Sequence, residues 1–192
     1  GIEPLKKMGA IIHGRQKDTL APITVIGSKL KPIEYAIPIA SAQVKSAILL
    51  AGLFAEGTTT VIEKEETRDH TERMLEYFGA KIKKENLKII LEGRPHLKGQ
   101  KIEIPSDISS AAFIMIAGVV VPCSEIIIRD VGVNGARTGI LDVLHRMGGN
   151  FEVSSERIIS NEPVADITIK FSKLKGVELS GAIISRIIDE IP

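Results

Sequence analysis

The sequence predicts an α/β protein built by repetition of a unit of about 70 residues. The tripeptide Met8-Gly9-Ala10 returns as Phe78-Gly79-Ala80 and again as Met147-Gly148-Gly149, at offsets of 70 and 69 residues. The stretch AILLAGLFAEGTTTVI, residues 47–62, also matches FIMIAGVVVPCSEIII, residues 113–128. This period is longer than that of solenoid repeats, so it indicates a supersecondary unit of helices and strands.

Each predicted unit begins with an apolar helix, over about residues 43–55 in the earlier copy and 109–120 in the later copy. A strand rich in β-branched residues follows, at 58–62 and at 125–129. The helix is apolar on nearly every side, which predicts that protein surrounds it. Further short strands are predicted at 88–91 and 166–171.

An amphipathic helix follows the strand in each copy, over about residues 69–78 and 138–147. In the earlier copy the predicted buried stripe consists of Met74, Leu75 and Phe78. The side chains expected to face water are Glu72, Arg73 and Glu76. Gly79 and Gly148 come directly after these helices, where glycine ends a helix most easily.

The composition is that of a globular protein with a substantial core. The chain has 192 residues, of which 44% are hydrophobic and 26% charged, and its net charge is +1. Charges of both signs alternate, as in Glu63-Lys64-Glu65-Glu66, which predicts a solvated surface. A near-neutral chain without Trp is not expected to bind nucleic acid or a membrane surface.

Cys123 is the single cysteine, so an internal disulfide or a cysteine-rich metal site is not expected. Its apolar surroundings, VVVPCSEIII, predict a small buried side chain rather than a nucleophile. The four histidines lack the close spacing of metal ligands. No cleavable leader or membrane-length apolar run occurs, which predicts a cytoplasmic protein.

Three polar motifs occur in order along the chain: Ser41-Ala42-Gln43-Val44-Lys45, Arg68-Asp69-His70-Thr71-Glu72 and Ile187-Ile188-Asp189-Glu190-Ile191-Pro192. Together they resemble the 5-enolpyruvylshikimate-3-phosphate (EPSP) synthase family, and the likeness runs along the whole chain. The first two motifs are similar to the bacterial class known for glyphosate tolerance. That class tends to carry N-x-T-R, whereas this chain has Ala136 at the third place of the corresponding motif.

The resemblance implies the enolpyruvyl transferase fold, an inside-out α/β barrel of repeated units in two domains that close over their substrates. Residues 1–105 would be the later part of the first domain, and residues 106–192 the early part of the second. The implied reaction transfers the enolpyruvyl group of phosphoenolpyruvate to the 5-hydroxyl of shikimate 3-phosphate and releases phosphate, in the shikimate pathway of aromatic amino-acid biosynthesis. No cofactor or metal is implied, and the full-length enzyme would be monomeric.

The same likeness implies that other substrate-binding residues lie outside this chain. We therefore expect the chain to be a piece of a longer protein and to lack synthase activity alone.

For shikimate 3-phosphate, the implied binding residues in the first part of the chain are Ser41, Ala42, Gln43 and Arg68, with Gln43 shared with phosphoenolpyruvate. Backbone N–H groups at a helix start and an arginine fork both suit anions. Two simpler interpretations stay open: Ser41 as an ordinary N-cap, and Arg68 as the partner of a nearby carboxylate.

Asp189 is the implied catalytic residue, which accepts the proton of the 5-hydroxyl and also contacts shikimate 3-phosphate. The neighbouring Glu190 is the alternative carboxylate, and a helix cap is the alternative role for Asp189. The residues for which structural roles are expected are Lys45 as an ion-pair partner, Asp69 as a helix cap, His70 and Glu72 as supporting residues, Asp107, Ser109 and Ser110 at the start of a helix, and Arg137 at a turn.

Two other functions are compatible with the same sequence features. One is the sister enzyme, an enolpyruvyl transferase acting on UDP-N-acetylglucosamine, although the first two polar motifs disfavour it. The other is a non-catalytic anion-binding repeat scaffold. Binding of shikimate 3-phosphate and the effect of Asp189→Asn on turnover distinguish them.

Overall fold

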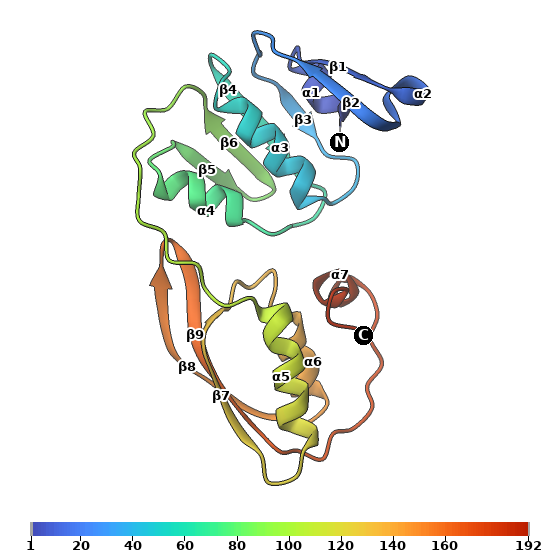
Figure 1. Cartoon of the computed structure of the whole chain (residues 1–192), viewed down its shortest axis with the longest axis vertical. Helices are drawn as coiled ribbons and strands as arrows, with labels where there is room; N and C mark the ends of the chain where they lie inside the picture. Colours follow the sequence, from blue (N-terminus) through green and yellow to red (C-terminus); the bar gives the residue numbers. More distant parts are fainter. Residues whose placement is uncertain (1, 192) are drawn as a thin grey trace. The chain divides into compact units, whose positions relative to one another are not determined.

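The computed structural model describes residues 2–191, and the chain divides into two compact units, Gly1–Gln100 and Lys101–Pro192 (Figure 1). Each unit has a hydrophobic core of its own, drawn from its own helices and strands. The assignment of the two parts to two larger domains stays a prediction.

The first unit is organised around a four-stranded sheet with the order β3-β4-β6-β5. Its strands are β3 (Glu34–Ala36), β4 (Thr58–Ile62), β5 (Ile82–Glu85) and β6 (Lys88–Glu92). β3 and β4 are parallel, whereas β6 is antiparallel to both of its neighbours. The two helices α3 (Ala42–Gly52) and α4 (His70–Tyr77) supply Ile48, Leu49 and Leu75 to the core. These side chains share one cluster with Val61, Ile89 and Leu91 of the sheet.

A hairpin precedes this sheet and was not predicted from the sequence. α1 (Ile2–Lys7) leads into β1 (Ile11–Gly14), the short α2 (Arg15–Asp18) and β2 (Leu20–Ile26). β1 and β2 pair antiparallel as a two-stranded sheet, and β2 is exposed along its whole length.

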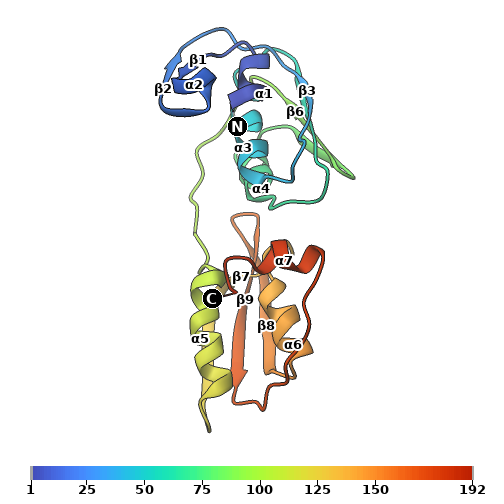
Figure 2. The ribbon, with the colours of Figure 1, turned by 90° about the vertical axis from the view of Figure 1, so that its right-hand side faces the viewer.

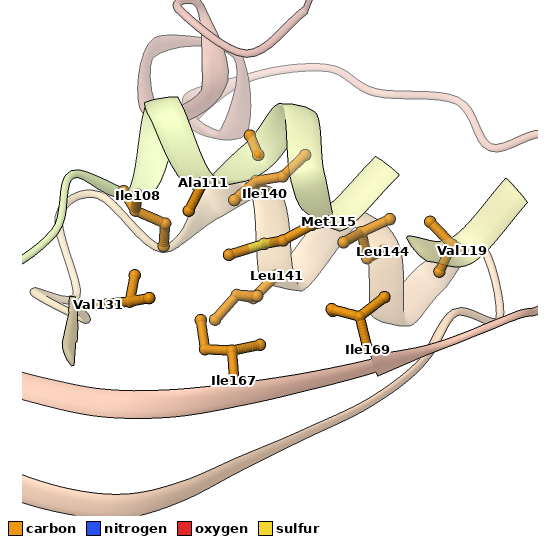
Figure 3. Close-up of a cluster of buried hydrophobic side chains, with 11 residues drawn as sticks. Ile108, Ala111, Met115, Val119, Val131, Ile140, Leu141, Leu144, Ile167 and Ile169 are labelled. Atoms are coloured by element: carbon orange, nitrogen blue, oxygen red, sulfur yellow. The ribbon is translucent and has the colours of Figure 1, made fainter. Parts of the chain in front are cut away.

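The second unit has a three-stranded antiparallel sheet with the order β7-β9-β8. Its elements are α5 (Ile108–Val120), β7 (Glu125–Gly132), α6 (Gly139–Arg146), β8 (Asn150–Ile159), β9 (Glu162–Lys170) and α7 (Ala182–Ile187). Figure 3 shows Met115 of α5 and Leu144 of α6 pointing towards Ile167 and Ile169 of β9, so both helices cover one face of the sheet. α7 packs beside α6 through a smaller apolar cluster that includes Val143 and Ile183 (Figure 2).

The sequence repeat has a packing explanation in both units. A Cβ atom on Gly52 of α3 would lie 2.9 Å from Thr59 Oγ1, and one on Gly118 of α5 would lie 2.8 Å from Ile169 Cγ2. Both distances are shorter than a normal contact, so the matched glycines allow each helix to approach its sheet. The predicted helix ends are confirmed as well, because Gly79 and Gly148 have φ of +96° and +83°.

The predicted positions of the main elements are confirmed to within a few residues, and β4 spans the predicted residues 58–62. Burial was predicted wrongly for Cys123 and for two residues of α4. Cys123 is exposed, in a left-handed backbone conformation (φ +61°) between α5 and β7. On α4, Met74 is 48% exposed whereas Glu72 is only 8% exposed. The inward face of α4 therefore runs through Glu72 and Leu75, three residues apart, because a buried lysine accompanies the glutamate.

The two apolar helices are also more open than predicted. Leu50 of α3 is 49% exposed and Phe113 of α5 is 72% exposed, although the opposite faces of both helices are fully buried. Within this chain, each helix packs on one side only.

Candidate active site

The first predicted binding segment lies at the start of α3, where Ser41 is the N-cap. Ser41 Oγ accepts a hydrogen bond from the backbone N–H of Val44 (3.3 Å), and its hydroxyl donates to Gln43 Oε1 (3.3 Å). Gln43 is exposed, and Ser41 and Ala42 are half-buried. The cap interpretation is thus confirmed. Binding of an anion by Ser41, Ala42 and Gln43 stays a prediction, compatible with this geometry because the first N–H groups of a helix lack partners within the helix.

Lys45, two residues after Gln43, points inward and is completely buried. Its Nζ lies 3.0 Å from Glu63 Oε1 and 2.6 Å from Glu72 Oε1, and these carboxylates are 3% and 8% exposed as residues. The three side chains come from α3, the end of β4 and α4, so they join three separate elements. The expected structural role of Lys45 is confirmed, and we call these three residues the buried ion cluster.

Glu63 contradicts the prediction that Glu63-Lys64-Glu65-Glu66 is a solvated run. The inward positions of β4 are Thr59 and Val61, and the same alternation carries Glu63 inward after the strand ends. There its Oε1 accepts from the backbone N–H of Thr67 (3.2 Å) and from the Thr67 hydroxyl. The period of two along β4 was the signal that could have revealed this residue.

The charges of the buried ion cluster are unequal, since one lysine faces two carboxylates. Burial raises the pKa of Glu72 above its ordinary value; the hydrogen bond and charge of Lys45 oppose this shift, and the nearby Asp69 adds to it. The fold therefore favours a proton on Glu72 more than water does.

Arg68 lies half-buried in the segment between β4 and α4, directly after Thr67 and before the N-cap residue Asp69. Asp69 occupies the predicted N-cap position, but its side chain does not form the capping hydrogen bond. Its Oδ2 instead lies 3.0 Å from Arg73 Nε, one turn further along α4. A second link joins the two helices: the hydroxyls of Ser46 and Thr71 lie 2.6 Å apart. His70, the first residue of α4, is half-buried, and its supporting role stays a prediction.

In the second unit, the start of α5 forms a polar network. Asp107 is the N-cap and accepts from the backbone N–H (3.0 Å) and the hydroxyl (3.1 Å) of Ser110. Arg137 donates to Asp107 Oδ1 (2.8 Å) and to Ser109 Oγ (2.6 Å). Burial acts to raise the pKa of Asp107, but the Ser110 donors and Arg137 outweigh it, so the pKa is lowered. The predicted structural roles of these residues are confirmed.

The two candidate carboxylates after α7 differ in their surroundings. Glu190 accepts a hydrogen bond from the hydroxyl of Ser109, which ties it to the start of α5. Asp189 is exposed. The side chain that the resemblance selects is therefore the more accessible of the pair, and its catalytic role stays a prediction. The predicted site residues of the first unit lie on two neighbouring segments, whereas Asp189 belongs to the second unit.

The first unit also contains a cleft of about 230 Å³ beside α4. Its lining residues are Asp69, Glu72, Arg73, Glu76, Ile82, Lys84 and Ile89. None of the predicted binding residues lines this cleft, so it does not support substrate binding. Among residues 2–191, no group of three His, Cys, Asp or Glu side chains is arranged to hold a metal ion. None of the helices in this part of the chain is long and apolar enough to cross a membrane.

A distant solved structure shares the fold of this chain. The enolpyruvyl transferase NikO from Streptomyces tendae aligns with 89% of this chain, with a TM-score of 0.63 and 16% sequence identity. At this identity the likeness supports the fold alone. The predicted enolpyruvyl transferase fold is thereby confirmed. The chain belongs to the EPSP synthase (3-phosphoshikimate 1-carboxyvinyltransferase) family, whose model matches residues 1–192.

Closer relatives agree with this family. The chain is 51% identical to the 3-phosphoshikimate 1-carboxyvinyltransferase of Geobacter metallireducens and 54% identical to that of Desulforamulus reducens, over 100% and 99% of its length. It spans 44% of the length of each of these relatives. The EPSP synthase from Acinetobacter baumannii superposes on 98% of the chain with a TM-score of 0.89 and 47% identity, and 43% of that protein is covered.

Proposed function

We propose that this chain is part of a 3-phosphoshikimate 1-carboxyvinyltransferase, which transfers the enolpyruvyl group of phosphoenolpyruvate to the 5-hydroxyl of shikimate 3-phosphate and releases phosphate. The supporting observation is the family match along residues 1–192, which includes all three polar motifs. The protein would act in the shikimate pathway, in the cytoplasm and as a monomer, without a cofactor.

The start of α3 and the segment around Arg68 would bind the phosphate and neighbouring groups of shikimate 3-phosphate. The N–H groups in the first turn of a helix and the positive end of its dipole favour a bound anion. The Ser41 hydroxyl already donates a hydrogen bond to Gln43 Oε1, so a phosphate oxygen can replace that acceptor. Arg68 adds a planar cation that can form two parallel hydrogen bonds with a phosphate. Gln43, exposed on the same turn, would also contact phosphoenolpyruvate.

Asp189 would take the proton of the 5-hydroxyl while the hydroxyl oxygen bonds to C2 of phosphoenolpyruvate and C3 takes up a proton from a donor elsewhere in the full-length enzyme. Loss of a C3 proton with departure of phosphate then restores the double bond in the product. A general base must reach the hydroxyl proton within hydrogen-bonding distance, so an exposed carboxylate is suitable. The register of the family motif favours Asp189 over Glu190, whose carboxylate accepts a hydrogen bond from the Ser109 hydroxyl.

The test is Asp189→Asn in the full-length protein. We expect kcat to fall by about 100- to 10,000-fold, because general-base catalysis typically contributes that much. The dissociation constant of shikimate 3-phosphate should change far less, since Asn keeps the shape of Asp. Glu178→Gln, at an exposed position of the second unit, is the matched control. Unchanged turnover in Asp189→Asn would exclude Asp189 as the base.

Ligand protection tests the substrate class separately. Shikimate 3-phosphate should raise the melting temperature of the full-length protein, because a ligand that binds only the folded state stabilises it. UDP-N-acetylglucosamine should have no such effect. Protection by the UDP-sugar instead would identify the sister enzyme, and protection without turnover would indicate a binding scaffold.

A further inference from the structure

The reaction described above does not use the buried ion cluster, yet its three members lie next to the predicted substrate-binding residues. Burial makes the cluster unusual, because side chains such as lysine and glutamate are seldom removed completely from water. Desolvation largely cancels the attraction within buried ion pairs, so their net contribution to stability is often small. The cluster is therefore better suited to fixing the geometry of its neighbours than to adding stability.

The first connection runs through Glu63. One oxygen of this carboxylate, Oε1, lies 3.0 Å from Lys45 Nζ and accepts the backbone N–H of Thr67 (3.2 Å) together with the Thr67 hydroxyl. Thr67 is bonded directly to Arg68. Lys45 in turn lies two residues after Gln43 on α3. A single carboxylate thus joins the helix that presents Gln43 to the peptide that precedes Arg68.

The second connection runs through Glu72 on the first turn of α4. Lys45 Nζ lies 2.6 Å from Glu72 Oε1, and the neighbouring hydroxyls of Ser46 and Thr71 are 2.6 Å apart. The segment with Arg68 is therefore attached to α3 on both sides, at Thr67 before it and at Thr71 and Glu72 after it.

We propose that Lys45, Glu63 and Glu72 are positioning residues for shikimate 3-phosphate: they hold Arg68 at a fixed place relative to Ser41, Ala42 and Gln43. This inference rests on the proposed function, because it assigns Arg68 to the same ligand as α3. The physical reason for using charges is specificity. A shifted arrangement of the segment would separate Lys45 from a buried carboxylate, and an uncompensated buried charge is strongly disfavoured.

The decisive variant replaces all three charges at once, Lys45→Met with Glu63→Met and Glu72→Met, in the full-length protein. Loss of Lys45 alone would leave two buried carboxylates without a cation and can prevent folding, whereas apolar replacement of a complete cluster is commonly tolerated. The triple variant lacks the carboxylate acceptor for Thr67. We expect its KM for shikimate 3-phosphate to rise roughly 10- to 100-fold, the value of one charged hydrogen-bonded contact. Its KM for phosphoenolpyruvate should change much less.

Two controls separate positioning from general stability. Glu63→Gln keeps an oxygen acceptor for the Thr67 N–H and leaves one lysine with one carboxylate, so it should retain a KM near that of the wild type. Leu91→Ala removes a fully buried side chain from the core of the first unit without touching the cluster's charges. Assayed where both proteins are folded, it should leave that KM unchanged. An unchanged KM in the triple variant, or an equal rise in Leu91→Ala, would overturn the proposal.

A second measurement does not depend on the substrate. Hydrogen exchange of the Thr67 amide should be faster in the triple Met variant than in Glu63→Gln, because only the latter keeps an oxygen acceptor for this N–H. If exchange accelerates but the wild-type protein fails to bind shikimate 3-phosphate, the proposed function fails while the anchoring of Arg68 stands. If exchange is unaffected, the positioning role fails even when the synthase activity is present.

Discussion

Glu72 brings a second carboxylate to the single buried lysine of the first unit, and this excess makes the residue sensitive to pH. The charged groups around it are Lys45 in direct contact, Glu63 on the other side of that lysine, and four residues that line the same cleft, Asp69, Arg73, Glu76 and Lys84. Burial dominates these influences and raises the pKa of Glu72. An acid with a raised pKa in the folded state stabilises the fold while it is protonated, and this contribution disappears as the pH rises through that pKa.

Glu72→Gln should therefore become more stable relative to the wild type as the pH rises. Gln stays neutral at every pH, so near the ordinary carboxylate range the two proteins should differ little. Above the raised pKa, the variant avoids the cost of a buried charge, about 1.4 kcal/mol for each unit of pKa shift. Urea denaturation across a pH series measures the difference. Glu65→Gln, at an exposed position of the same unit, should give a difference that is flat with pH.

At the scale of the element, the glycines in the apolar helices control how closely each helix approaches its sheet. Gly118→Ala should destabilise the protein by about 1–3 kcal/mol, because the new methyl group would enter space occupied by Ile169 and force α5 away from β9. Thermal denaturation gives the value. Gly176→Ala is the matched control, since a Cβ there meets no atom within 4 Å. Equal stability of Gly118→Ala and the wild type would contradict this account of the repeat.

The elements could be predicted from the sequence where the residue pattern and the residues that end helices, such as glycine, agree. β4 follows a run of β-branched residues, and Gly79 marks the end of α4. The hairpin of β1 and β2 could not be found in this way, because residues 16–18 of its connection adopt positive φ without a glycine. Residue-type patterns also treat a charged side chain as exposed. They placed Glu72 in water and Cys123 in the core. The burial of Glu72 is explained by its ion pair with Lys45.

Only part of the candidate site could be predicted from the sequence. The helix start at Ser41 follows from capping, and helical spacing places Lys45 one turn further along α3. The roles of Glu63 and Thr67 depend on how α3 packs against the segment that follows β4. Such a contact requires the fold, although the alternation along β4 indicates which way Glu63 points.

At the scale of the whole molecule, the two units have separate cores. The buried cluster of the first unit lies between Met8 and Leu91, and that of the second unit lies between Ile108 and Ile169, with no shared residue. Compact units with independent cores tend to open as separate cooperative units. Substitutions in one core should then act locally, since distant sites without common partners are usually independent.

Hydrogen exchange on the full-length protein tests this independence. Gly118→Ala should accelerate the exchange of slow amides in β7 and β9 and leave those in β4 and β6 unchanged. Gly52→Ala should do the opposite, because its Cβ would meet Thr59 and Leu91 of the first sheet. Gly176→Ala should affect neither set. Acceleration of both sheets by either substitution would mean that the two cores open together, and the repeat would then act as one cooperative structure rather than as two.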